Sequence, residues 1–84
     1  MRIFLQAPVT EDRPPRYYQL FIQEDLLGGW SLVRQWGYQG GQVTVQREYH
    51  ECREEAELAM THYRDAQLKR GFRVVFAQGE EAPR

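Results

Sequence analysis

Three stretches in the first half of the chain alternate between apolar and polar residues, a pattern that predicts half-buried β-strands. They cover residues 17–24, 30–38 and 42–50. The glycine pairs Gly28-Gly29 and Gly40-Gly41 lie between them and give the backbone the freedom that tight turns require. The pattern therefore predicts an antiparallel meander.

The periodicity changes to that of a helix between residues 53 and 70. Its apolar positions fall on one stripe, formed by Ala56, Ala59, Met60, Tyr63 and Ala66. Glutamates crowd the first turns and Lys69 and Arg70 end the segment, an order that complements the helix dipole. Gly71 is suited to terminate this helix.

Shorter apolar runs flank these elements. Residues 3–5 and 72–77 predict a first and a last strand, whereas residues 8–16 hold three prolines and predict a loop. Residues 78–84 predict a flexible polar tail. The chain, 1–84, is thus predicted to be one α+β domain with its core at about 17–76: a twisted antiparallel β-sheet of four to five strands with one α-helix packed on it.

The size and composition are those of a small soluble domain. A chain of 84 residues has room for one domain. It has no apolar run near the roughly 20 residues of a membrane helix, and its N-terminal apolar stretch is too short for a signal peptide. Cys52 is the only cysteine, which excludes an internal disulfide. We expect a cytoplasmic monomer with no membrane partner.

The charged residues are unusual in kind rather than in balance. The net charge is −1, so the whole molecule does not attract nucleic acid. Ten of the eleven basic residues are arginines, which suit bidentate phosphate contacts better than lysine does. Codon usage in a GC-rich genome would also favour arginine, so this composition alone does not decide the function.

Neither catalysis nor metal binding is supported by the sequence pattern. His50 and Cys52 would share a strand face, but the sequence places no acidic residue to orient the histidine, and a small buried thiol is the commoner interpretation. One cysteine and two histidines match no zinc pattern, and the turn glycines match no phosphate-binding loop. We expect a chain that is not an enzyme and has no catalytic residues, metal or cofactor.

Residues 34–42, Arg-Gln-Trp-Gly-Tyr-Gln-Gly-Gly-Gln, are the most informative stretch. Glycine weakens a strand, so Gly37 indicates the close approach of another backbone or of a ligand beside the Trp36 ring. Arg34 and Arg47 fall on adjacent predicted strands, and no Asp or Glu lies from Leu26 to Arg47. An aromatic ring flanked by guanidinium groups is typical of sites that hold exposed bases.

Packing in the core is the competing interpretation for both tryptophans. We favour it for Trp30, whereas Trp36 fits core packing and nucleotide contact equally well. Leu58 and Leu68 fall off the helix stripe. Exposed leucines of this kind are common, but together they keep a protein-partner surface open as an alternative.

The run 17–74 resembles the WGR domain, named for its Trp-Gly-Arg tripeptide. The resemblance implies a twisted antiparallel sheet with one helix against it. WGR domains occur in poly(ADP-ribose) polymerases that sense DNA breaks and in small bacterial proteins, and in the polymerases the motif Trp packs against nucleotide at a DNA end. The matching pieces are Tyr17-Tyr18-Gln19-Leu20, residues 30–37, Gly40-Gly41-Gln42, Glu54-Glu55-Ala56 and Lys69-Arg70-Gly71-Phe72.

The resemblance implies a non-enzymatic module that binds DNA ends or another nucleic acid, with Trp36 as the main contact. The predicted site comprises Trp36, Gly37, Tyr38, Arg34, Arg47 and Gln39. Tyr38 stands where the family has its Arg, and the turn at 39–42 is short and lacks basic residues. A protein–protein interaction module without DNA binding is therefore the alternative.

Overall fold

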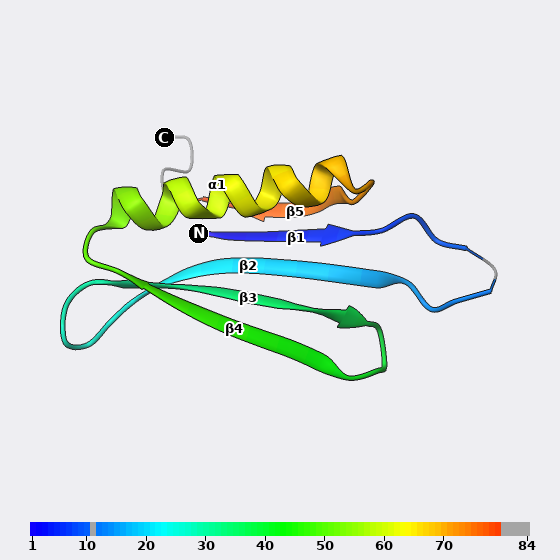
Figure 1. The fold of residues 1–84 in the computed structure, drawn as a ribbon, viewed down its shortest axis with the longest axis horizontal. Helices are drawn as coiled ribbons and strands as arrows, with labels where there is room; N and C mark the ends of the chain where they lie inside the picture. Colours follow the sequence, from blue (N-terminus) through cyan, green and yellow to red (C-terminus); the bar gives the residue numbers. More distant parts are fainter. Residues whose placement is uncertain (11, 80–84) are drawn as a thin grey trace.

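The computed structural model describes residues 1–10 and 12–79. Along the chain these residues form β1 (Arg2–Gln6), β2 (Arg16–Glu24), β3 (Trp30–Tyr38), β4 (Val43–His50), α1 (Arg53–Lys69) and β5 (Arg73–Gln78) (Figure 1). One five-stranded sheet carrying a single helix confirms the predicted α+β class. Of the predicted tail at 78–84, Gln78 belongs to β5, and residues 80–84 lie outside the described part of the chain.

The sheet has the strand order β4-β3-β2-β1-β5, and each neighbouring pair is antiparallel. The meander β2-β3-β4 follows the chain, as predicted, and β1 adds to its β2 edge. Helix α1 then leads from β4 at one edge of the sheet to β5 at the other, so it has to cross one face. Figure 1 shows α1 running roughly along the strands, and the helix lies closest to β2 and β3.

The core lies between α1 and the face of the sheet that it crosses. Strand alternation places Leu5, Leu20 and Leu32 on this face, and each is fully buried in one cluster that includes Met60 of the helix. Burial of one such side chain stabilises the fold by about 1.5–3 kcal/mol. We call this side of the sheet the helix face, and the opposite side the open face.

A backbone motif at the end of α1 positions the residues that follow it. Gly71 has φ +99°, and its N–H donates to the Leu68 carbonyl, while the Phe72 N–H donates to the Gln67 carbonyl. This pair of bonds is a Schellman motif, which satisfies carbonyls that the helix leaves open. The chain reverses there, with the result that Phe72 enters the core beside β2.

The helix itself is polar outside its core stripe. Ala56 and Met60 are buried, while Leu58 and Leu68 are exposed, as their positions off the stripe predict. The predicted apolar stripe did not include Gln67, which is buried near the end of the helix. Within the described part of the chain, no helix combines the length and apolar character needed to cross a membrane.

Candidate nucleic-acid interface

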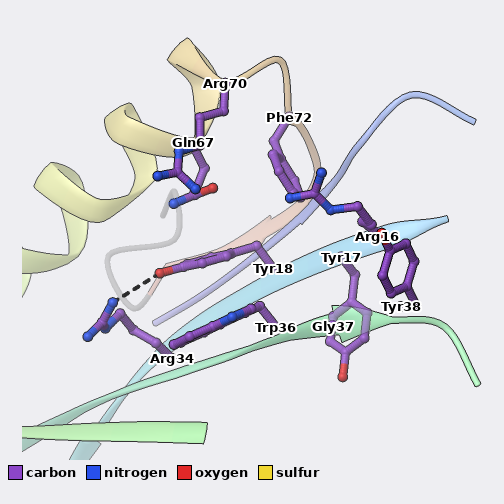
Figure 2. Close-up of a pocket in the computed structure, with 10 residues that line it drawn as sticks. All are labelled: Arg16, Tyr17, Tyr18, Arg34, Trp36, Gly37, Tyr38, Gln67, Arg70 and Phe72. Carbon is purple, nitrogen blue, oxygen red and sulfur yellow. Dashed lines mark hydrogen bonds between the residues drawn. The ribbon is translucent and has the colours of Figure 1, made fainter. Parts of the chain in front are cut away.

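A cleft of about 430 Å³ lies between the end of α1 and the helix face of the sheet. Side chains from β2, β3, the last turn of α1 and the segment before β5 line it (Figure 2). Trp36, Gly37, Tyr38 and Arg34 all belong to this lining, so the structure brings four of the six predicted site residues together.

An aromatic wall forms one side of the cleft. The Trp36 and Tyr18 rings stack with their centroids 5.4 Å apart and 11° between their planes, and Phe72 meets Tyr18 edge-on at 6.3 Å. Trp36 is half-buried and packs against the core. On β4, the residue paired with Trp36 is Thr44, which is small and exposed. Packing and accessibility therefore coexist at Trp36, because Tyr18 stacks on its ring while the paired residue on β4 is small.

Arg34 contacts two rings of this wall, Tyr18 and Trp36. Its Nη1 donates to Tyr18 Oη at 3.3 Å and its Nη2 donates to Gln46 Oε1 at 3.1 Å. The guanidinium carbon lies 5.4 Å from the Trp36 ring centroid and 4.1 Å from that of Tyr63, and both distances are within cation–π range. The Arg34 Nε is buried and has no hydrogen-bond partner among the described residues.

Two further arginines, Arg16 and Arg70, line the cleft. Arg16 is paired with Tyr38 across the β2–β3 ladder, and its guanidinium lies 5.3 Å from the Phe72 ring centroid. Arg70 is the C-cap of α1. Both side chains are exposed, and within residues 1–10 and 12–79 neither forms an ion pair.

The cleft therefore combines aromatic surface with positive charge. Three arginines line it, and none of its ten lining residues is acidic. Figure 2 shows the Arg16 side chain beside Phe72, the Arg70 side chain next to Gln67, and Arg34 next to Trp36. Sequence reasoning missed Arg16 and Arg70 because they are far from Trp36 in the chain. The meander register would have paired Arg16 with Tyr38, whereas nothing local signals the position of Arg70.

The Glu48 carboxylate, close to Arg34, interacts with two polar side chains. Tyr63 Oη donates to Glu48 Oε1 at 2.7 Å, and His50 Nε2 lies 2.6 Å from Glu48 Oε2. Burial by itself raises the pKa of Glu48, but the bonds from Tyr63 and His50 and the charges of His50 and Arg34 lower this pKa overall. The hydrogen bond to Glu48, together with burial, raises the pKa of Tyr63.

This cluster predicts how stability depends on pH. The lowered pKa of Glu48 stabilises the fold above its ordinary value of 4.5, and this contribution disappears as the pH falls through the lower, folded-state pKa. The raised pKa of Tyr63 stabilises the fold below 10.0, and this contribution disappears as the pH rises through the folded-state pKa. Tyr63→Phe should cost about 1 kcal/mol at neutral pH, since it removes one hydrogen bond to a partly exposed carboxylate.

Urea unfolding on both sides of these two pH values checks the prediction. In a plot of unfolding free energy against pH, Glu48→Gln should reduce the loss of stability at acid pH. Tyr63→Phe should reduce the loss of stability at alkaline pH. Glu24→Gln, which removes an exposed carboxylate, is the matched control and should follow the wild type. Equal losses of stability at acid pH for Glu48→Gln and the wild type would contradict the assignment.

The other predicted site residues lie elsewhere. Arg47 pairs with Val33 and points to the open face, so the expectation that it accompanies Arg34 beside Trp36 is corrected by the register, which pairs Arg34 with Gln46. Gln39 follows β3 and lines a separate hollow with Phe4. Gly37 is explained by a backbone contact, because a Cβ there would collide with the Gln42 carbonyl oxygen.

The histidine and cysteine weighed for catalysis are also placed. A carboxylate that the sequence did not reveal, Glu48, does lie against His50. Cys52 occupies the N-cap position of α1 and is partly buried. Among the described residues, no group of three or more His, Cys, Asp or Glu side chains is arranged to hold a metal ion.

Comparison of the chain with protein-family models, with curated proteins and with solved structures finds no match.

Proposed function

We propose that this chain is a non-enzymatic module that binds nucleic acid, namely DNA at a strand end that carries a phosphate. One observation carries the proposal: Trp36, stacked on Tyr18, lies in a cleft with three arginines and no carboxylate. The resemblance of Trp36-Gly37 to the WGR motif supports it, because the motif Trp of that family packs against nucleotide at a DNA end.

The cleft has the size and polarity for one terminal nucleotide. Its volume of about 430 Å³ falls within the range of roughly 300–1,000 Å³ that is common for small-ligand pockets. Arg16 and Arg70 are the exposed cations that would hold the phosphate, since guanidinium groups bind phosphate oxygens in a bidentate manner. Trp36 would contact the sugar or base, and Arg34 keeps its ring in place.

A module that binds a protein partner is the second candidate. Leu26 and Leu27, in the turn between β2 and β3, are 101% and 96% exposed. Leu58 and Leu68 add exposed apolar surface on α1. Tyr38 at the position of the motif Arg also favours this candidate. The two candidates differ in the residues they require, since the leucines lie outside the cleft.

A DNA hairpin with one blunt end tests the first proposal. Fluorescence anisotropy at low salt should show that the hairpin with a 5′-phosphate binds more tightly than the same hairpin with a 5′-hydroxyl. Arg70→Gln should lower the affinity for the phosphorylated hairpin about tenfold. It should also reduce the slope of log affinity against log salt concentration (the salt slope) by about 1, because one phosphate contact is lost.

Lys69→Gln is the matched control. It removes the same charge from the neighbouring position on α1, but Lys69 does not line the cleft, so its effect should be small. Equal affinity for the two hairpins, or equal losses in Arg70→Gln and Lys69→Gln, would overturn the proposal and favour the protein-interaction candidate.

A further inference from the structure

Among the residues that the structure describes, the open face of the sheet carries arginines and no carboxylate. Two strand residues are acidic, Glu24 and Glu48, and their cross-strand partners Trp30 and Leu32 place both on the helix face. The other described acidic residues lie in turns, loops or α1. Within residues 1–10 and 12–79, the arginines of the open face therefore have no acidic neighbour on it.

Aromatic and amide side chains form a row across this face. The ladder register places Phe76, Phe4, Gln19, Gln35 and Val45 side by side, from β5 to β4. Phe76 and Val45 are about half exposed, at 50% and 51%. A row of two rings, two amides and an aliphatic group is suited to flat ligands that also form hydrogen bonds.

The row is hollowed near its centre. A depression of about 410 Å³ is lined by Phe4, Tyr17, Gln19, Gln35, Gln39 and Gly40. The Phe4 and Tyr17 rings are nearly parallel, with centroids 5.9 Å apart and 16° between their planes. Three glutamine amides thus surround a stacked aromatic pair.

Arginines flank the hollow on both sides. In the next row, Arg2 pairs with Phe21, and Arg47 pairs with Val33. The Arg2 guanidinium lies 4.9 Å from the Phe21 ring centroid. In the row on the other side, Arg73 pairs with Gln6. A ligand seated in the hollow therefore has guanidinium groups on either side of it.

We propose that the open face binds unpaired single-stranded DNA, with a thymine base in the hollow and the adjoining phosphates on the arginines. Unpaired bases stack on aromatic side chains, and amides hydrogen-bond to the base edges that pairing would otherwise occupy. Val45 beside Gln35 offers the apolar contact that suits the methyl group of thymine. This site goes beyond the proposed function because it uses the other face of the sheet and needs no strand end.

A second copy of the chain is a poorer occupant of this surface. A symmetric pairing of open faces would bring Arg2, Arg47 and Arg73 towards the same arginines of the other copy. Since the described part of the chain places no carboxylate on this face to compensate them, these charges would repel. A polyanion that carries flat rings satisfies both the charge and the shape.

Short oligothymidylate without a terminal phosphate tests the proposal on the full chain. The side-chain amide signals of Gln19 and Gln35 should shift on titration. Phe4→Leu should weaken binding about tenfold, because it removes a stacking ring. Arg47→Gln, at an exposed position, should weaken binding about fivefold and lower the salt slope by about 0.7, the value for one phosphate of a single strand.

Two controls keep the open face distinct from the cleft. Arg70→Gln and Lys69→Gln should bind oligothymidylate like the wild type, so a failure of the phosphorylated hairpin to bind leaves this site untouched. An abasic strand with the same phosphates should bind at least tenfold more weakly. Equal binding of the abasic strand, a preference for oligouridylate, or no effect of Arg47→Gln would each overturn the proposal.

Discussion

Gly37→Ala should lower the free energy of unfolding by about 2 kcal/mol, an effect typical of overpacking. The alanine Cβ would collide with the backbone carbonyl oxygen of Gln42, the residue that precedes β4. A backbone oxygen, unlike the end of a flexible side chain, cannot move aside by changing rotamer. The strands would have to separate locally, and the pair Gly37–Val43 would be lost first.

Gly41→Ala is the control for this prediction. Gly41 lies in the same turn, but a Cβ there would meet Tyr38 atoms at 3.5 Å, an ordinary van der Waals distance. Urea unfolding should therefore give a small change for Gly41→Ala and a large one for Gly37→Ala. Equal changes in the two variants would show that the Gln42 contact does not determine the need for glycine.

Trp36→Leu should weaken binding of the phosphorylated DNA hairpin roughly tenfold to a hundredfold. Stacking of a base on an aromatic ring contributes about 1–3 kcal/mol, and leucine cannot replace it. Trp36→Phe keeps a flat ring in the same position and should retain most of the affinity. This comparison separates stacking from bulk, since both variants shorten the side chain.

The second tryptophan makes the measurement direct. Trp30 lies at the start of β3 with the Arg53 guanidinium 5.5 Å from its ring centroid, and it does not line the cleft. In a Trp30→Phe background, Trp36 is the sole indole, because the chain has two tryptophans. Quenching of its fluorescence by the phosphorylated hairpin is expected. Unchanged fluorescence, together with unchanged affinity in Trp36→Leu, would exclude Trp36 from the interface.

The elements themselves were predictable because their signals are local. The alternation of apolar residues from 17 to 50 predicted β2, β3 and β4, and the change of period predicted α1 to within one residue of its end. The same alternation assigns Arg47 to the face opposite Arg34 once the register is known. Strand pairing between distant segments, such as β1 with β5, has no local signal and was not predicted.

The sequence by itself thus determined the α+β class and the order of the elements along the chain. The tertiary structure decided which side chains accompany the Trp36 ring. Arg16 and Arg70 reach the Trp36 cleft because strand pairing and the chain reversal at Gly71 join segments that are 54 positions apart in the numbering (70 − 16). Contacts between such segments depend on how the sheet and helix pack as a whole, and local periodicity does not predict that packing.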